Sequence, residues 1–319
     1  MILVTGASGF VGKALSIHLS KKSNLRVSVR DKAAFGCFEG LDVVEASLSE
    51  NQDWSNALDG ISTVIHCAAR VHVMNENVAD PLIEYRRINV DGTLRLARQS
   101  AELGVRRFVF VSSIKVNGEH SHPDQPFTAD QIPEPGDPYG VSKSEAEAAL
   151  RDLAEKTGME VVIIRPPLVY GPGVKANFLT MMCWLHRGVP LPLGGVTGNM
   201  RSLVFLDNLV DLIARCIDHP SAANQIFLVS DDDDLSTTEL LRRMAVALGC
   251  PARLIRIPAG LILLGAQLIG RPSISQRLCG SLAVDIGKTK ALLGWLPPVS
   301  VDEGLRITAD HWRKSLESS

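Results

Sequence analysis

The sequence lacks an excess of charge of either sign. Its 33 lysines and arginines face 35 aspartates and glutamates, which leaves a formal net charge of −2 at pH 7. A protein that binds nucleic acid through its phosphates needs a strong positive surplus, so nucleic acid is excluded as a partner. With 319 residues, 45% of them hydrophobic, the chain is long enough for two domains or for one large α/β domain with an appended lobe.

Long apolar runs and a secretion signal are also missing. Residues 1–5 are apolar, but they lead directly into a glycine turn without basic residues or a cleavage site, so we expect no signal peptide. The most apolar stretch, 257–270, is about fourteen residues long, whereas a bilayer span needs ~20. The sequence therefore predicts a buried helix at 257–270, no membrane span and a cytoplasmic protein.

Paired cysteines and metal-binding motifs are absent as well. No C-x-x-C pair and no nearby histidine cluster accompany the six cysteines, which are Cys37, Cys67, Cys183, Cys216, Cys250 and Cys279. This spacing predicts reduced, mostly buried thiols, with neither a disulfide nor a metal site. The four aspartates at 231–234 are expected to form a solvated loop, and Ser236 or Thr237 then caps a helix.

Short β-branched runs alternate with helical patterns through the first half of the chain. The predicted strands are 2–5, 25–29, 41–44, 63–66, 107–111 and 161–164, and the predicted helices are 11–20, 54–58, 80–103 and 139–157. Strands that are apolar nearly throughout suit a parallel sheet covered on both faces. The alternation predicts an α/β fold with a doubly wound parallel sheet of the Rossmann type.

Proline and glycine punctuate the chain between 166 and 198, and the later helices are joined by longer loops. We therefore expect a smaller, discontinuous C-terminal lobe that closes over a ligand. The predicted division is a dinucleotide-binding domain at 1–168, with return segments at about 203–230, and a ligand-binding lobe at 169–202 and 231–319. The segments 203–217 and 226–229 are expected to bring the chain back to the sheet.

A glycine motif follows the first predicted strand and opens a helix. Gly6 permits the tight turn, Gly9 lets the backbone approach a pyrophosphate, and Gly12 packs the helix against the strand. The helix N-terminus then presents free N–H groups and its positive dipole end to the phosphates. This motif predicts dinucleotide binding.

The end of the second strand discriminates between NAD and NADP. Arg30 falls there, and a guanidinium pairs with a 2′-phosphate through a fork of hydrogen bonds. NADP(H) is therefore favoured. In the alternative, Arg30 only stacks over the adenine and the neighbouring Asp31 holds the ribose of NAD(H).

Tyr139 and Lys143 are four residues apart, so they share one face of a predicted helix. A neighbouring ammonium stabilises a phenolate and brings its pKa closer to a useful range for acid–base chemistry. Ser112 and Ser113 end the fifth strand, at the edge where a parallel sheet presents ligand-facing groups.

These motifs are accompanied by His66-Cys67-Ala68-Ala69, Asn89-Val-Asp-Gly-Thr93, Arg165-Pro166, Tyr170-Gly171-Pro172 and Leu293-Gly294-Trp295. Together with residues 5–12 they resemble the extended short-chain dehydrogenase/reductase superfamily, over essentially the whole chain. Within it, the resemblance is to the NAD-dependent epimerase/dehydratase branch that acts on nucleotide sugars. It implies that Tyr139 is the acid/base, that Lys143 also binds the nicotinamide ribose, and that Ser113 hydrogen-bonds the reacting sugar oxygen.

The resemblance also implies larger sets of binding residues. The cofactor set is Gly6, Ser8, Gly9, Phe10, Val11, Gly12, Arg30, Ser47, Leu48, Cys67, Ala68, Ala69, Asn89, Ser112, Tyr139, Lys143 and Pro166. The substrate set is His72, Ser113, Lys115, Tyr139, Asn177, Arg201 and Arg277. Three positions depart from the family pattern: Ser47 replaces the usual acid, Leu168 replaces an asparagine, and Asn117 replaces a tyrosine.

Subfamilies of this branch add catalytic groups beside the serine. Dehydratases carry an Asp-Glu pair there, decarboxylases a glutamate and 3,5-epimerase/reductases a cysteine, whereas this chain has Ile114 and Lys115. What remains is 4-keto reduction or 4-epimerisation of a UDP-sugar. Since Arg30 favours NADPH, and 112–119 and 165–178 look most like bacterial O-antigen enzymes, we expect reduction of a UDP-linked 6-deoxy-N-acetylhexosamine.

Two alternatives stay open. The first is an NAD-dependent 4-epimerase of UDP-hexoses or UDP-N-acetylhexosamines, and the second is a non-catalytic NADP-sensing protein. In either case the family resemblance implies a homodimer, in which 80–103 and 139–157 pack against their symmetry mates as a four-helix bundle.

Overall fold

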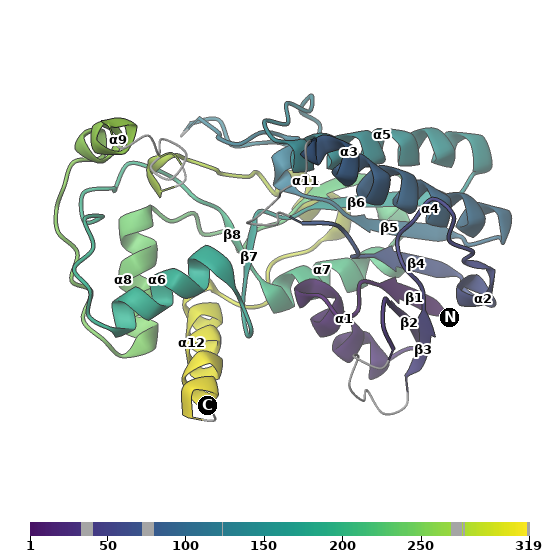
Figure 1. Cartoon of the computed structure of the whole chain (residues 1–319), viewed down its shortest axis with the longest axis horizontal. Helices are drawn as coiled ribbons and strands as arrows, with labels where there is room; N and C mark the ends of the chain where they lie inside the picture. Colours follow the sequence, from purple (N-terminus) through teal and green to yellow (C-terminus); the bar gives the residue numbers. More distant parts are fainter. Residues whose placement is uncertain (33–40, 72–79, 123, 269–275, 277, 318–319) are drawn as a thin grey trace.

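Seven parallel strands form the central sheet (Figure 1), in the order β3-β2-β1-β4-β5-β6-β9. They are β1 (Ile2–Thr5), β2 (Leu25–Val29), β3 (Asp42–Glu45), β4 (Thr63–His66), β5 (Arg107–Val111), β6 (Glu160–Arg165) and β9 (Ile226–Leu228). The computed structural model describes all residues except 33–40, 72–79, 123, 269–275, 277 and 318–319. The order confirms the predicted doubly wound sheet. Strands β1, β2, β4 and β5 have the predicted bounds, and β3 and β6 differ by one residue at each end.

Helices cover both faces of the sheet. On one face lie α1 (Phe10–Ser20), α7 (Leu206–Asp218) and α11 (Gly287–Leu293), whose apolar side chains share one core with Val4. On the other lie α2 (Ser55–Leu58), α4 (Thr93–Glu102) and α5 (Pro138–Thr157), which share a second core with Leu3. Neighbouring strand residues enter opposite cores because side chains alternate along a strand. That requirement explains the nearly continuous apolar runs.

A third core lies in the smaller C-terminal lobe. It joins a two-stranded parallel sheet, β7 (Leu168–Tyr170) and β8 (Leu203–Phe205), to helices α6 (Ala176–His186), α8 (Thr237–Leu248) and α12 (Val301–Glu317). The expected return to the main sheet at 203–217 is wrong in part, because β8 pairs with β7 and the rest is α7. Residues 284–295 of the expected lobe segment 231–319 instead join the core around β1, through Val284 and Trp295.

The predicted single helix at 80–103 is divided into three parts. These are α3 (Pro81–Tyr85), a π-helical segment η1 (Arg86–Gly92) and α4. Asp80 caps the start, since its carboxylate accepts a hydrogen bond from the backbone N–H of Leu82 at 2.9 Å. A π-helical turn rotates the side chains that follow it, and such turns are frequent at functional sites.

The apolar segment at 257–270 was predicted to be a buried helix, and this is wrong. The helix α9 (Ala259–Leu268) contains no buried residue, and Leu261, Leu264 and Leu268 are 60%, 53% and 82% exposed. Hydropathy alone does not tell whether a neighbour covers a helix, and here only one side packs against the lobe. None of the helices in the described part of the chain combines the length and hydropathy needed to cross a bilayer.

The expected solvated loop at 231–234 is also wrong in part. Asp231 is buried and accepts hydrogen bonds from the Tyr170 hydroxyl at 2.8 Å and the Asn208 amide at 2.7 Å. Burial raises the pKa of both Asp231 and Tyr170. Ser236 is the predicted cap of α8, since its hydroxyl oxygen accepts from the N–H of Glu239 at 3.1 Å.

The cysteines in the described residues are free thiols, as expected. They are less buried than predicted, however, since Cys216 is buried and the others are half-buried. Cys37 lies outside the described residues.

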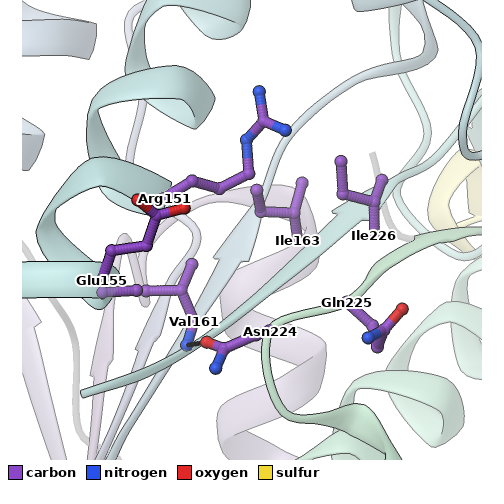
Figure 2. A pocket seen from close by; sticks show the side chains of 8 residues that line it. Arg151, Glu155, Val161, Ile163, Asn224, Gln225 and Ile226 are labelled. Atoms are coloured by element: carbon purple, nitrogen blue, oxygen red, sulfur yellow. Dashed lines mark hydrogen bonds between the residues drawn. The ribbon is translucent and has the colours of Figure 1, made fainter. Parts of the chain in front are cut away.

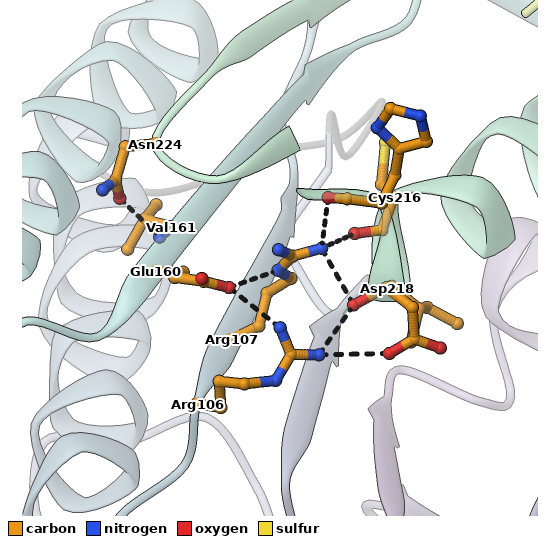
Figure 3. A network of polar contacts seen from close by, with 9 residues as sticks. Arg106, Arg107, Glu160, Val161, Cys216, Asp218 and Asn224 are labelled. Carbon is orange, nitrogen blue, oxygen red and sulfur yellow. Dashed lines mark hydrogen bonds and ion pairs between the residues drawn. The ribbon is translucent and has the colours of Figure 1, made fainter. Parts of the chain in front are cut away.

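At the amino edge of the sheet, a buried guanidinium binds a carboxylate and the end of a helix. Arg107 at the start of β5 donates to the Glu160 carboxylate at 2.7 Å and to the carbonyls of Cys216 and His219 at 2.7 and 3.0 Å (Figure 3). These carbonyls belong to the C-terminal end of α7 and the residue after it, where helix carbonyls lack intrahelical partners. Arg107 therefore fastens α7 to the sheet at the edge opposite the glycine turn.

A cavity of about 170 Å³ lies near the same amino edge. Figure 2 shows Arg151 and Glu155 of α5 above Val161 and Asn224, whose side-chain oxygen accepts from the Val161 N–H at 3.0 Å. Glu155 is sixteen residues beyond Tyr139 on α5, which corresponds to about 24 Å along the helix. Ligands of doubly wound sheets bind at the carboxyl edge, so this cavity is separate from the candidate site.

Candidate active site

The glycine turn lies at the carboxyl end of β1 and is packed against the loop after β4. Gly6 has a φ of 74°, and a Cβ there would come within 2.6 Å of the Ala68 nitrogen. At Gly12, a Cβ would lie 2.2 Å from the Gly6 carbonyl oxygen. Helix α1 begins with Gly9 as its N-cap, without a side-chain cap. The turn thus leaves the first N–H groups of α1 to a ligand, which suits a pyrophosphate.

A groove of about 480 Å³ extends from this turn along the carboxyl ends of β1 to β4. Nine residues predicted for the cofactor line it: Gly6, Ser8, Gly9, Arg30, Ser47, Leu48, Cys67, Ala68 and Ala69. Sequence reasoning missed Thr5, Ser28, Val29, Ala46, Trp54, Arg70, Val71 and Ile88. Most of these follow or end a predicted strand, so strand position was the signal that could have found them.

The lining of this groove is cationic. Within the described residues it includes Arg30 and Arg70 and no aspartate or glutamate. Arg30 is exposed at the carboxyl end of β2, and Ser47 is exposed where the family usually has an acid. The groove therefore fits an anionic dinucleotide, because no carboxylate of the described lining opposes its phosphates.

The other predicted cofactor residues lie around this groove but not on its surface. Phe10, Val11 and Gly12 form the first turn of α1, and Pro166 follows β6 with its carbonyl bonded to the Ile114 N–H at 3.0 Å. Asn89 is buried in η1 and holds the groove loop, accepting from the Arg70 N–H at 2.8 Å and donating to the Arg70 carbonyl at 3.1 Å. Its amide also donates to the Ser142 hydroxyl at 3.0 Å. Asn89 thus holds the backbone of Arg70, which lines the groove, in place.

Tyr139 and Lys143 lie on one face of α5, near its N-terminus, where Asp137 caps the helix. Lys143 is 2% exposed; its ammonium donates to the Val111 carbonyl at 2.9 Å and lies 4.2 Å from the centre of the Phe110 ring. Burial lowers the pKa of Lys143 to about 8, although Glu147 and Cys67 oppose the shift. Burial also raises the pKa of the Tyr139 phenol, with Asp137 adding to the rise. The expected lowering of the phenol pKa by Lys143 is therefore not present in this structure.

Beneath the serines lies a buried polar network that sequence reasoning missed. The carboxylate of Glu147 accepts from the Ser112 hydroxyl at 2.5 Å and forms a fork of hydrogen bonds with Arg165, the shortest of 2.5 Å. Arg165 also donates to the side-chain oxygen of Asn117 at 2.9 Å, and Asn117 donates to the Thr128 carbonyl at 2.9 Å. The network ties β5, α5 and β6 together at the carboxyl edge, and it explains why asparagine stands at 117.

Ser113 is half-buried just after β5, and its hydroxyl accepts from the Lys115 N–H at 3.3 Å. The Lys115 ammonium forms ion pairs with Asp137 and with Glu119, the latter at 3.2 Å. Ser113 thus lies beside the start of α5, and Lys115 is held by two carboxylates.

His66 and Cys67 at the end of β4 are not acid–base groups. His66 is fully buried between the hydroxyls of Thr5 at 2.6 Å and Thr93 at 3.0 Å, and burial lowers its pKa to about 3. Burial raises the pKa of the Cys67 thiol to about 12. Both side chains are therefore neutral near pH 7.

The predicted substrate residues of the lobe are partly described. Asn177 is exposed in the first turn of α6. Arg201 is half-buried, and its guanidinium donates to the Gly280 carbonyl at 3.1 Å. The next residue, Ser281, accepts through its carbonyl from the Ser121 N–H at 3.0 Å, so this part of the lobe adjoins the loop after Ser113. His72 and Arg277 lie outside the described residues.

A glycine turn opens onto a groove whose described lining has no carboxylate, and serine, tyrosine and lysine lie at the same sheet edge. These features define an extended short-chain dehydrogenase/reductase. More narrowly, the chain belongs to the NAD dependent epimerase/dehydratase family, which matches residues 2–230. It is a nicotinamide-dependent enzyme.

Three comparisons specify the similarity further. The chain is 48% identical over 308 residues to the UDP-glucose 4-epimerase of Vibrio cholerae, covering 97% of this chain and 94% of the relative. It matches the structure of MoeE5 in complex with UDP-glucose and NAD with a TM-score of 0.77 and 25% identity, over 99% of both chains. It matches RMD from Pseudomonas aeruginosa complexed with NADPH with a TM-score of 0.75 and 21% identity, over 98% of this chain and 99% of that one.

Proposed function

We propose that the protein is a 4-epimerase of UDP-hexoses or UDP-N-acetylhexosamines. The observation that carries the proposal is the 48% identity to a UDP-glucose 4-epimerase over nearly the whole of both chains. This similarity reverses the order expected from the sequence, in which a 4-ketoreductase came first. The site agrees, because Ile114 and Lys115 provide neither of the extra acids that a dehydratase needs.

The chain's own residues supply the proton chemistry. Tyr139 takes the proton of the C4 hydroxyl in one direction and returns it to the 4-keto oxygen in the other. Ser113 donates a hydrogen bond to the same oxygen, and the Lys143 ammonium stabilises the Tyr139 phenolate. Burial raises the pKa of Tyr139, so the protonated phenol is the form favoured in this structure, and it is the form that returns a proton to the 4-keto oxygen.

A nicotinamide cofactor held in the groove would supply the hydride acceptor and donor for C4 of the sugar. The groove that begins at Gly6 fits this group, because a side chain at Gly6 or Gly12 would collide with backbone and no carboxylate of the described lining opposes the phosphates. We assign NADP(H) as the preferred form on account of Arg30. An epimerase regenerates its cofactor in each turnover, so an NADP preference is compatible with epimerisation.

The substrate lies, in this proposal, between the sheet edge and the lobe formed by 169–202 and parts of 231–319. Arg201 supports the assignment, because its half-buried guanidinium lies beside Gly280 in the lobe and a guanidinium pairs with a diphosphate through charged hydrogen bonds. Asn177 is at the start of α6, where a helix N-terminus favours an anion.

A homodimer is part of the same proposal. The exposed apolar side chains of Ile83 and Leu103, at the two ends of the α3–α4 segment, support packing of this face against a symmetry mate. Sedimentation that shows a stable monomer at micromolar concentration would contradict the dimer. We also assign the enzyme to the cytoplasm, since its free thiols suit a reducing compartment.

A second candidate function, NADPH-dependent 4-keto reduction, is favoured specifically by Arg30 in the acid-free groove. The experiment incubates the purified protein with UDP-N-acetylglucosamine or UDP-glucose without added cofactor, and separately with NADPH and a UDP-4-keto-6-deoxy-N-acetylhexosamine. An epimerase equilibrates the first substrates at C4. Consumption of NADPH with the ketosugar, and no interconversion of the others, would show that the reductase is correct.

The catalytic assignment is tested in the same assay. Tyr139→Phe is expected to lower the rate about 1,000-fold, because it removes the acid/base and preserves the ring. Ser113→Ala is expected to cost less. Unchanged thermal unfolding and cofactor binding of both variants control for folding.

Cofactor choice is tested on Arg30. Arg30→Asp should weaken NADPH binding by about 10- to 150-fold, the value of one charged hydrogen bond, and leave NADH binding intact or improved. Equal affinities of the wild-type protein for both cofactors would contradict the NADP assignment.

A further inference from the structure

Helix α9 presents an apolar stripe that nothing in the described part of the chain covers. Leu261, Leu264 and Leu268 are at spacings of three and four, so they share one face of the helix, and each is more than half exposed. Ala259 and Ile262 pack on the lobe core. At 3.6 residues per turn these two groups lie on opposite sides of the helix. α9 is therefore anchored by one side and open on the other.

The exposed stripe continues onto the neighbouring chain segments. Residues 253–258 run beside 188–195, joined by hydrogen bonds from the Leu191 N–H to the Arg253 carbonyl and from the Gly194 N–H to the Ile255 carbonyl, both of 2.9 Å. Ile255 is 52% exposed, and Val189 on the neighbouring segment is also exposed. In Figure 1 these two traces follow the outer edge of the lobe up to α9, at the end furthest from β3.

The same region is strongly cationic. Between residues 244 and 284 the sequence has four arginines and no aspartate, glutamate or lysine, and the structure describes two of these arginines, Arg253 and Arg256. Arg253 and Arg256 directly precede α9 and are exposed, and Arg187 is exposed beside Arg253. Within the described residues, none of these three forms an ion pair. A chain with a net charge of −2 thus places exposed arginines beside the exposed apolar stripe of α9.

We propose that this face, consisting of α9 with Ile255, Arg253 and Arg256, docks the enzyme on an anionic phospholipid bilayer. A surface helix that is anchored to its protein by one side binds the membrane interface by placing its exposed apolar side among the acyl chains, while cationic neighbours contact the headgroups. A second copy of the chain is a poorer occupant, because two such faces would bring their arginines together. The face contains none of the residues assigned to the reaction or to the dinucleotide groove, so the inference is independent of the reaction catalysed.

The test is flotation of the full-length protein with vesicles of phosphatidylcholine alone or with about one third phosphatidylglycerol. We expect binding to the anionic vesicles and loss of binding at high salt. The triple variant Leu261→Gln, Leu264→Gln and Leu268→Gln should weaken binding about 100-fold, since each half-exposed leucine contributes about fivefold. Arg253→Gln with Arg256→Gln should weaken it about 30-fold.

A matched control removes exposed apolar side chains elsewhere, by Ile132→Gln, Leu296→Gln and Leu316→Gln, and should leave binding unchanged. Thermal unfolding of each variant verifies folding, and turnover of a water-soluble UDP-sugar should be unaffected. Absence of wild-type binding to the anionic vesicles, or equal binding by the α9 variants, would overturn the proposal. So would a change of oligomeric state in the α9 variants, because the stripe would then be an interface between copies.

Discussion

Lys143 is assigned a role in turnover, and the burial of its charge also destabilises the fold. One substitution tests both effects. Its ammonium is buried at 2% exposure, and burial lowers its pKa from the ordinary value of 10.5 to about 8. The charged form is therefore less stable in the folded protein than in the unfolded chain. We predict that Lys143→Met abolishes turnover and at the same time stabilises the fold near neutral pH.

The magnitude follows from the pKa shift. A change from 10.5 to about 8 corresponds to about 3 kcal/mol of destabilisation at pH values below both pKa values. Removing the side chain also removes the hydrogen bond to the Val111 carbonyl and the contact with the Phe110 ring, together about 2 kcal/mol. The expected net gain in unfolding free energy near neutral pH is thus about 1 kcal/mol.

The way the unfolding free energy changes with pH tests the argument more sharply than the net gain at one pH. Below about pH 8 both states carry the proton on Lys143 and the full penalty applies. Between about pH 8 and 10.5 the unfolded chain binds more protons than the folded protein, so the stability of the wild type rises with pH. The difference in unfolding free energy between Lys143→Met and the wild type should therefore fall by about 2 kcal/mol between about pH 7.5 and 9.5, from a gain of about 1 kcal/mol to a loss of about 1 kcal/mol.

Urea unfolding followed by circular dichroism at these two pH values measures the difference directly. Lys13→Met, at an exposed position of α1, is the matched control for loss of a lysine. An advantage of Lys143→Met that stays constant from about pH 7.5 to 9.5 would refute the argument, because Lys143 would then not change charge in that range.

The remaining predictions concern the buried network and the glycine turn. Glu147→Gln leaves the Arg165 guanidinium buried without its carboxylate and should cost about 3–5 kcal/mol of unfolding free energy, measured in urea. The double change Glu147→Leu with Arg165→Met should recover most of that loss, and failure to recover would show that the charges matter less than the shape. Gly12→Ala places a Cβ against the Gly6 carbonyl and should cost about 1–3 kcal/mol together with dinucleotide affinity, by calorimetry. Gly198→Ala, which meets no neighbour within 4 Å, is its control.

The sheet could be predicted from the sequence because each strand is buried on both faces. Leu3 enters one core and Val4 the other, so a parallel strand must be apolar throughout and is visible as a short unbroken run. The glycine turn could be predicted for a comparable reason, since at Gly6 and Gly12 any side chain would collide with backbone. In the strands and in the glycine turn, the local environment permits only a few residue types, so the sequence alone reveals the structure.

Features that depend on distant partners could not be predicted in this way. The hydropathy of α9 is the same whether a neighbour covers the helix or not, so the exposure of Leu264 is decided by tertiary packing alone. The four aspartates at 231–234 appear equivalent in sequence, yet Asp231 is buried because Tyr170 and Asn208 happen to face it. Composition identifies an apolar or an acidic segment, but it does not tell which distant residues pack against that segment.

Helix α5 shows how the predicted and the missed residues belong together. Tyr139, Lys143 and Glu147 recur every four residues, so they form one stripe along α5. Burial lowers the pKa of Lys143, whereas the carboxylate of Glu147 one turn further raises it. Glu147 is itself held by Arg165 and Ser112, so its position depends on three separate elements. The charge on Lys143 near pH 7 is therefore maintained by a network that no single motif reveals, and a motif search finds the reacting groups before it finds what holds their charge.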